Sequence, residues 1–445
     1  MSLAMGDPSY TSRTPRSREL FERARKVIPG GTSYSNRFFP PYPFYVSRAR
    51  GSHIWDVDGN EYVDYWMVHW GAVFGHAYPP IVRAAVEQVE EGAHIGWSTE
   101  WEVKWAEAVG GWFEAERVKP ANSGTEANMY AVRLAQAFTG RKKVAKVEGG
   151  WHGGFDRLQK AVSYPYDKPA SLGLQRDRAT VVIPFNDLDG AAKILKKERP
   201  ACVLIEPMLG AAGAIPAEPE FLKGLRELCD GEGMLLIFDE VITGPRHPGG
   251  LQKLYGVKPD LTTLGKGFGG QYFAGAGGIC GRAEVMDLLN HVERPKFWQR
   301  SFLGGTFVGN PLSMRVGYTF VRELEARKDV VYGHIDGLGE GVRRGLREVL
   351  EDHNFEAYVT GLGSLIGLHF TKEMPRDGRT AARTKDVKLC QRFFLHMLER
   401  GIAYLTPTSI HFAISTAHTK EEAEGLVMGL EAFLSGGEGV APARP

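Results

Sequence analysis

Cysteine is scarce in this sequence, and its scarcity excludes two kinds of architecture. The 445 residues include only four cysteines, Cys202, Cys229, Cys280 and Cys390. They form no CxxC pair, and no histidine lies at the spacing that a zinc site needs. A disulfide scaffold and a structural zinc site are therefore not expected, and a reducing compartment is the default. We expect a cytoplasmic protein without a bound metal.

An excess of charge of one sign is also lacking. Fifty-four basic residues stand against fifty-three acidic ones, which leaves a net charge of +1. This balance argues against a dedicated surface for nucleic acid or for an anionic membrane. The first residues lack the apolar stretch of a signal peptide, and the longest uncharged stretches are broken by Pro, Ser, Thr and His. HExxH and GxSxG motifs are absent, so metal catalysis and serine hydrolysis find no support.

Apolar residues are plentiful, at 43% of a chain long enough for two or three domains. Between about residues 100 and 330, helical patterns alternate with short, nearly all-apolar runs at 143–147, 180–184, 202–206 and 234–238. Such alternation indicates an α/β fold with a mostly parallel sheet that helices cover on both faces. We predict a large domain over 65–330 and a smaller α+β domain built from 331–445 and the N-terminal segment 1–64. A helix is expected over 11–29, before a Pro-Gly-Gly stop.

Two of the apolar strands end in residues suited to chemistry. Asp239 follows the run 234–238, and a buried carboxylate needs a positive partner, although an isolated Asp there could equally cap the next helix. Lys266 follows the run 261–264 and has glycine on either side. A buried amine with a lowered pKa suits Schiff-base chemistry. A phosphate-loop role for Lys266 is disfavoured, because Gly267 stands where that motif needs Ser or Thr.

Two further elements complete a plausible site. Ser123, Gly124 and Thr125 open a helical pattern, where backbone N–H groups bind anions, although Ser123 and Glu126 also fit a plain capping box. Trp151 lies in a glycine-rich loop, either as core packing or as a platform for a flat ligand. Together the elements match one planar ligand that carries a phosphate, a ring nitrogen and an aldehyde. That ligand is pyridoxal 5′-phosphate.

Four segments carry a resemblance to a known family. NSGTEA (122–127), LLIFDEVITG (235–244), TTLGKGFGG (262–270) and GGTFVGNPLSM (304–314) resemble the class III aminotransferases, which have the type I fold of pyridoxal-phosphate enzymes. The match runs in order from about residue 25 to 425. It implies that Lys266 is the Schiff-base lysine and that Asp239 is the partner of the pyridine nitrogen. The other residues that it assigns to the cofactor are Ser123, Gly124, Thr125, Trp151, His152, Glu206, Val241 and Thr306.

The same resemblance implies an assembly. Thr306 matches the threonine that reaches the cofactor phosphate of a neighbouring subunit, which makes a homodimer the expected form. A loop hydroxyl that satisfies local backbone is the alternative for Thr306.

Within the family, the chain is most similar to the glutamate-1-semialdehyde aminomutase branch, through the motif PGGTSYSNRF (29–38) among others. This implies a small-molecule amino substrate, cycling of the cofactor through its pyridoxamine form, and 5-aminolevulinate as product. Arg37 would hold the substrate carboxylate, and Trp70 and His411 would line the substrate site. His411 stands where that branch has a glutamate, and residues 155–183 look shorter than its gating loop.

These two departures keep other reactions open. They are intermolecular transamination of a β-amino or aromatic amino acid, and racemisation on the same scaffold. A catalytically silent cofactor-binding protein is the alternative outside enzymes.

Overall fold

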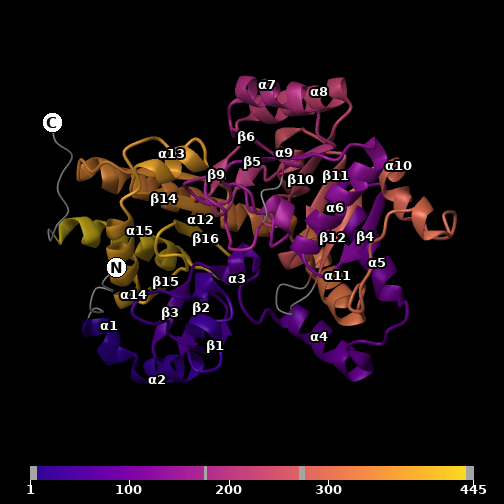
Figure 1. Cartoon of the computed structure of the whole chain (residues 1–445). Coiled ribbons are helices and arrows are strands. Elements are labelled where there is room, and N and C mark those ends of the chain that lie inside the picture. The colour runs from indigo at the N-terminus through magenta and orange to yellow at the C-terminus, as the bar shows by residue number, and fades with distance from the viewer. Residues whose placement is uncertain (1–7, 175–177, 270–275, 437–445) are drawn as a thin grey trace. The chain divides into compact units, whose positions relative to one another are not determined.

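The computed structural model describes residues 8–174, 178–269 and 276–436, and its chain divides into two compact units (Figure 1). The terminal unit consists of Met1–Tyr78, His334–Met374 and Thr384–Pro445. The central unit consists of Pro79–Gly333 and Pro375–Arg383. The predicted domain limits at 64 and 330 stay a prediction. The boundaries between the compact units lie later in the chain, after Tyr78 and after Gly333, and residues 375–383 belong to the central unit again.

A seven-stranded sheet forms the middle of the central unit (Figure 1). Every neighbouring pair among β11, β10, β7, β5 and β6 is parallel, while β12 runs antiparallel to both β11 and β4. The predicted mostly parallel sheet is therefore confirmed. In spatial order the strands are β4 (Arg117–Ala121), β12 (Gly277–Gly281), β11 (Leu261–Leu264), β10 (Leu235–Asp239), β7 (Cys202–Ile205), β5 (Val144–Val147) and β6 (Thr180–Ile183).

Helices cover both faces of this sheet, because its strands are apolar on both sides. Leu235 and Ile237 of β10 join a core cluster with residues of α6, while Leu236 and Phe238 join a second cluster with residues of α7 and α8. The longer helices of this unit are α4 (Pro79–Gly92), α5 (Glu100–Phe113), α6 (Gly124–Thr139), α7 (Leu188–Glu198), α8 (Pro219–Glu232) and α11 (Pro311–Ala326). The shorter elements are β8 (Met208–Leu209), β9 (Ile215–Pro216), α9 (Gly250–Tyr255), α10 (Ala283–Met286), α13 (Gly378–Arg383) and the 3-10 turns η3 (Asp156–Leu158), η4 (Lys266–Gly269), η5 (Asp287–Leu289) and η6 (Phe297–Gln299).

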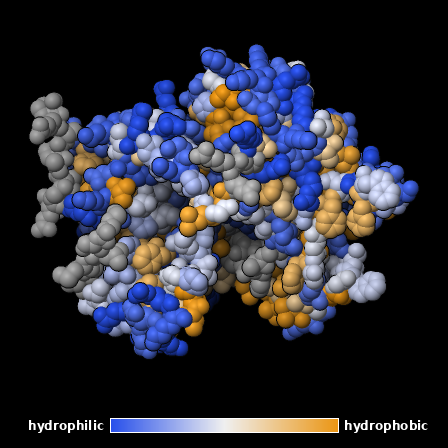
Figure 2. Space-filling model, in the orientation of Figure 1, coloured by the Kyte–Doolittle hydropathy of each residue, from blue (hydrophilic) through white to orange (hydrophobic). Residues whose placement is uncertain are grey.

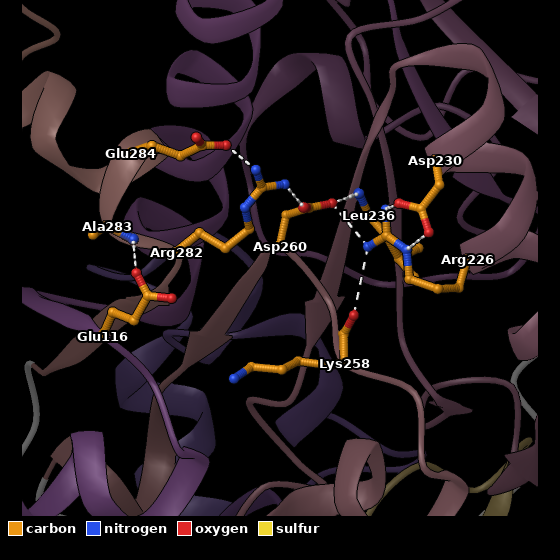
Figure 3. Close-up of polar contacts among 9 residues, drawn as sticks. All are labelled: Glu116, Arg226, Asp230, Leu236, Lys258, Asp260, Arg282, Ala283 and Glu284. Carbon is orange, nitrogen blue, oxygen red and sulfur yellow. Dashed lines mark hydrogen bonds and ion pairs between the residues drawn. The ribbon is translucent and has the colours of Figure 1, made fainter.

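A buried carboxylate ties the sheet together where β11 begins (Figure 3). Asp260 is 3% exposed, and its Oδ2 accepts the Leu236 N–H at 2.7 Å and an Arg226 N–H at 2.8 Å. Its Oδ1 accepts from Arg282, which also pairs with Glu284. Two guanidinium groups therefore neutralise this carboxylate, as a buried charge requires. The network fixes β10 against β11.

The terminal unit holds two small sheets. One has the order β1 (Val46–Arg50), β2 (His53–Asp56), β3 (Glu61–Asp64) and β15 (Ile402–Ala403), so it joins both ends of the chain. The other has the order β13 (Tyr358–Leu362), β14 (Leu365–His369) and β16 (Ile410–Ala413). The remaining elements of this unit are α1 (Pro8–Arg13), α2 (Pro15–Ala24), η1 (Pro29–Gly31), η2 (Ser35–Arg37), α3 (Met67–Trp70), α14 (Val387–Glu399) and α15 (Lys420–Ser435). The long α12 (Lys328–Asp352) runs from the central into the terminal unit. The predicted α/β class with a smaller α+β part from both termini is confirmed.

The single helix predicted over 11–29 is wrong. The chain forms α1, breaks at Thr14 and then forms α2, which ends at Ala24. Pro15 causes the break, because proline lacks an N–H and disfavours the helical conformation in the residue before it. No helix of the described ranges is both long and apolar enough to cross a membrane. All four cysteines are buried free thiols.

Candidate active site

Lys266 lies just beyond the carboxyl end of β11, in the middle of the sheet. Its φ is 48°, a left-handed conformation that costs an ordinary residue about 1–2 kcal/mol. Gly267 leaves room for the ring of Phe320, since a Cβ at this position would lie 2.5 Å from it. Backbone strain of this kind concentrates at functional sites. The strained lysine is therefore the first feature that marks this edge of the sheet as a site.

Asp239 is the last residue of β10 and is paired in register with Thr263, three residues before Lys266. The carboxylate is 4% exposed. Its Oδ2 accepts from Asn128 Nδ2 at 2.7 Å and from His152 Nδ1 at 2.9 Å, while Oδ1 accepts the Val241 N–H at 3.1 Å. A carboxylate has about four acceptor positions, so one remains for a further N–H donor.

His152 is fully buried, and burial lowers the pKa of its imidazole. The neutral ring therefore donates from Nδ1 to Asp239. Its Nε2 has no hydrogen-bond partner among the described residues. A buried ring nitrogen without a partner is a group that a bound ligand can satisfy.

Asn128 belongs to this site although the sequence analysis did not single it out. Thr263 Oγ1 donates to Asn128 Oδ1 at 2.6 Å, and this bond turns the amide so that Nδ2 faces Asp239 and the carbonyl of His152. Asn128 is 1% exposed on an otherwise apolar face of α6. A polar residue in that place of the helical pattern was the signal that could have revealed it.

Glu206 follows β7 and is 4% exposed. Its two oxygens accept the N–H groups of Trp151, at 2.8 Å, and of Gly210, at 3.1 Å. Burial and the neighbouring charge of Asp239 raise the pKa of this carboxyl, and burial lowers the pKa of the Lys266 amine against the attraction of both carboxylates. Burial therefore favours the uncharged forms of both Glu206 and Lys266.

The amino end of α6 forms the other part of the site. Ser123 caps the helix by accepting the Glu126 N–H at 3.1 Å, which is one half of a capping box. The Glu126 carboxylate accepts the Asn122 N–H, at 2.9 Å, in place of the Ser123 N–H. Gly124 and Thr125 occupy its first turn, whose N–H groups have no acceptor within the helix. Gly153 packs against Thr125, and a Cβ at Gly153 would lie 2.1 Å from Thr125 Oγ1. The amino end of a helix favours the binding of anions such as a phosphate.

Val241 closes the space between these two parts. A Cβ at Gly124 would lie 2.9 Å from Val241 Cγ2, and a Cβ at Gly265 would lie 3.3 Å from Cγ1. Trp151 is 38% exposed in the loop after β5. The central unit thus gathers nine of the predicted residues: Ser123, Gly124, Thr125, Trp151, His152, Glu206, Asp239, Val241 and Lys266.

Thr306 also lies in the central unit, but on its surface. It is exposed within a turn in which the Val308 N–H donates to the Gly305 carbonyl at 3.1 Å. A Cβ at Gly305 would lie 3.1 Å from Asn122 Nδ2, so this turn abuts the chain just before α6.

Two predicted substrate residues meet in the terminal unit. The ring centroids of Trp70 and His411 lie 4.6 Å apart, edge to face, and Trp66 packs on the same imidazole at 5.3 Å. His411 Nδ1 has no partner among the described residues, and burial lowers the pKa of this imidazole to about 3. His411 is therefore a neutral ring within an aromatic cluster.

Trp70 is held in place by an unusual piece of backbone. The four residues of α3, none of them glycine, have φ between 44° and 68°, which makes this a left-handed turn. Asp64 stabilises its start, because Oδ1 accepts the Trp66 N–H and Oδ2 pairs with His76, each at 2.8 Å. A strained turn of this kind persists only when its surroundings fix it.

Arg37, the third predicted substrate residue, is exposed in η2. Its Nη1 donates to Ser33 Oγ at 2.9 Å. Tyr34 in the same segment packs on His69 at 5.6 Å, and His69 packs on Trp66 at 4.5 Å. One line of aromatic contacts therefore runs from the loop of Arg37 to His411.

Comparison with known proteins identifies the family. The model of the class III aminotransferases matches residues 34–434. The chain belongs to the class III aminotransferases. A curated glutamate-1-semialdehyde 2,1-aminomutase from Methanothermobacter thermautotrophicus is 39% identical over 95% of this chain and 99% of its own length. This class III aminotransferase is an enzyme that transfers amino groups of small molecules, as the resemblance predicted.

Solved structures of the family share the fold closely. An ω-transaminase from Sphaerobacter thermophilus has a TM-score of 0.88 at 34% identity, over 97% of this chain and 99% of that one. A β-phenylalanine aminotransferase from Variovorax paradoxus has a TM-score of 0.86 at 32% identity, over 98% and 97%. The type I fold is therefore confirmed.

Enzymes of this family use pyridoxal 5′-phosphate, and the chain is a pyridoxal-phosphate enzyme. The residues present fit that group. The α6 end suits a phosphate, Asp239 has an acceptor position left for a pyridinium N–H, and Lys266 offers an amine of lowered pKa. The unpartnered Nε2 of His152 and the glycine-lined space beside Val241 point to the same ligand.

Proposed function

We propose that the enzyme converts glutamate 1-semialdehyde into 5-aminolevulinate. The observation that carries this proposal is the likeness to glutamate-1-semialdehyde 2,1-aminomutase along nearly the whole of both chains. Substrate and product are isomers, so the net reaction consumes no second amino donor or acceptor.

Lys266 is the proposed catalytic residue. When bound, the cofactor supplies an electron sink for the carbanion formed at the substrate carbon. Burial makes the Lys266 amine less basic than an exposed lysine, so it can both accept a proton from the substrate carbon and return one. Its strained position beside Gly267 holds the amine at one place on the sheet edge.

Asp239 is proposed to hold the pyridine nitrogen in its protonated form. Asn128 and His152 fix the carboxylate from one side, which leaves its remaining acceptor position in a defined direction. Ser123, Gly124 and Thr125 would bind the phosphate at the α6 end. Trp151, His152, Glu206 and Val241 would line the ring, as the sequence analysis predicted.

On the substrate side, we propose that Arg37 binds the carboxylate. It carries the charge that this role needs, whereas His411 is neutral and cannot replace it. Trp70 and His411 would then shape the site through aromatic contact. The role of the glutamate found at this position in the aminomutase branch is not taken over by His411.

A homodimer is the proposed assembly. Figure 2 shows hydrophobic residues gathered over α4. Large apolar side chains are exposed on the central unit, with these exposed fractions: Val86 52%, Val89 55%, Trp97 82%, Val103 58% and Phe307 60%. An exposed apolar surface of this kind is typical of a protein interface. Thr306 adjoins Phe307 and would reach the phosphate in the second subunit.

The four free thiols support a reducing compartment, the cytoplasm.

Intermolecular transamination is the second candidate. The aromatic line from Tyr34 to His411 favours it, because such a surface suits an aromatic or apolar amino acid. The β-phenylalanine aminotransferase among the similar structures supports the same direction.

The deciding experiment measures 5-aminolevulinate formed from glutamate 1-semialdehyde, with added pyridoxal or pyridoxamine phosphate and no other amino donor or acceptor. We expect steady product formation. A protein that binds the cofactor normally but makes no product contradicts the aminomutase. The next assay then pairs β-phenylalanine with a keto acid, and turnover there establishes the second candidate.

A further inference from the structure

One peptide unit in the loop after β5, which carries Trp151 and His152, is held from both sides by buried ionisable groups. Lys146 Nζ donates to the Gly150 carbonyl at 2.9 Å. The Trp151 N–H donates to Glu206 Oε1 at 2.8 Å. These two groups are the C=O and N–H of the same peptide bond. An amine donor and a carboxyl acceptor therefore bind opposite sides of the Gly150–Trp151 peptide.

Lys146 is an unusual residue for a strand interior. It lies in β5 between the parallel neighbours β6 and β7, is fully buried, and is one of the largest fully buried side chains of the molecule. Burial lowers the pKa of its amine to about 7, against the attraction of Glu206 and Glu148. A second bond, at 2.8 Å to the Lys160 carbonyl, holds the far end of the same loop.

The Lys146 donor and the Glu206 acceptor select one orientation of the peptide. Rotating the plane by half a turn would bring the carbonyl oxygen against the Glu206 oxygen and the N–H against the Lys146 amine. Unlike the observed bonds, both contacts would be repulsive, and electrostatic interactions are strong in a buried place. The neighbouring groups hold the loop in the same register, since the His152 carbonyl accepts from Asn128 at 3.2 Å and the Gly149 N–H donates to the Ala161 carbonyl at 2.9 Å.

We propose that Lys146 and Glu206 are positioning residues that orient the Gly150–Trp151 peptide and thereby place Trp151 and His152 against the cofactor. The proposal rests on the proposed cofactor contacts of those two residues. It assigns a role to Lys146, which the sequence analysis passed over. It also gives Glu206 a second role besides lining the ring, because each of its oxygens accepts a backbone N–H group and so holds the loop.

The test uses Lys146→Met, which keeps the length of the side chain and removes its donors. Cofactor dissociation from the full-length protein is followed by tryptophan fluorescence, and the orientation of the bound cofactor by its induced visible circular dichroism. We expect on the order of tenfold weaker cofactor binding, as for loss of a group that orients a ligand contact. The circular dichroism should change, and hydrogen exchange over 148–154 should be faster in the cofactor-free protein.

A stability measurement separates this role from a merely structural one. Replacing a buried charge by an apolar side chain of similar volume often leaves a fold as stable or more stable. We therefore expect the melting temperature of cofactor-free Lys146→Met to be unchanged or higher. The matched control is Lys160→Met, which removes an exposed lysine of the same loop. This lysine donates to the carbonyl of Thr180 in β6. It should leave cofactor binding and circular dichroism unchanged.

A folded Lys146→Met protein with unchanged cofactor affinity and circular dichroism overturns the proposal. If that variant does not fold, Glu206→Gln decides on the same two readouts. It keeps an acceptor for Trp151 but loses the charge, so a smaller change in the same direction is expected, and no change overturns the proposal. None of these measurements uses glutamate 1-semialdehyde, so failure of the proposed reaction leaves the result standing.

Discussion

The candidate site of the central unit and the His411 cluster of the terminal unit hold their buried polar groups in different ways. In the central unit, Asp239 and Glu206 are each held by two or more hydrogen bonds, and His152 is fixed through one nitrogen. In the terminal unit, His411 lies among aromatic rings, and its Nδ1 has no partner in the described part of the chain.

The difference matches the two tasks proposed for these places. A cofactor that stays bound through every cycle needs fixed charges in fixed places, and hydrogen-bond networks supply them. A substrate site must admit and release its ligand, and rings around a neutral imidazole would select the ligand by its shape. The cofactor side should therefore be sensitive to the loss of single charges, and the substrate side to changes of size and pH.

The largest effect is expected for Lys266→Ala. Without the amine, no residue of this chain is proposed to move the proton at the substrate carbon, so kcat should fall by at least about 10³-fold. Turnover and the visible absorbance of the lysine-bound cofactor are the measurements. Lys160→Met is the control and should retain full activity. A Lys266→Ala enzyme that works at the wild-type rate contradicts the mechanism.

Asp239→Asn and Asp260→Asn separate catalysis from stability, because both residues are buried acids linked to β10. Asp239→Asn removes the charge that is proposed to face the cofactor, and kcat should fall on the order of 10²-fold with little change in melting temperature. Asp260→Asn leaves Arg226 and Arg282 without their shared partner, and should cost about 2–3 kcal/mol of unfolding free energy with kcat preserved. Urea unfolding and steady-state kinetics on both variants test this. If Asp239→Asn instead lowered the unfolding free energy and left kcat unchanged, Asp239 would have a structural role only.

Arg37→Lys probes the substrate side. Lysine keeps the charge but cannot bind a carboxylate through two parallel N–H groups. KM for glutamate 1-semialdehyde should rise on the order of tenfold while kcat changes little. Equal affinity for cofactor in both proteins is the control. An unchanged KM would place the carboxylate elsewhere.

The smallest effect is a dependence of stability on pH. The pKa of His411 is about 3 in the folded protein, whereas an unfolded histidine has a pKa of about 6.5. Between these values the unfolded chain binds more protons, so the free energy of unfolding falls as the pH falls, by up to about 1.4 kcal/mol per pH unit. Urea unfolding between pH 7.5 and 5 should show a shallower loss for His411→Phe than for the wild type. If the free energy of unfolding fell equally with pH in both proteins, the pKa of His411 would not be lowered by folding.

The sequence by itself determined the α/β class, the family and the order of the motifs. Apolar runs that end in Asp239 and Lys266 predict chemistry at one sheet edge, because parallel strands bring their carboxyl ends together. The helical pattern over 11–29 concealed the break at Thr14. The signal for this break, Pro15, was present in the sequence. The tertiary structure alone decided which groups bind which. Asn128, Lys146 and Asp260 act through partners 4 to 135 residues away, and only folding brings such partners into contact.

The proposed substrate side depended most on tertiary structure. His411 is a single letter in an apolar strand, and its neutral state follows from burial among Trp66 and Trp70. The left-handed turn that holds Trp70 is built from residues that ordinarily avoid that conformation, so local preference could not predict it. Local pattern determines elements and motifs, whereas burial and the partners met across the fold determine charge and strain.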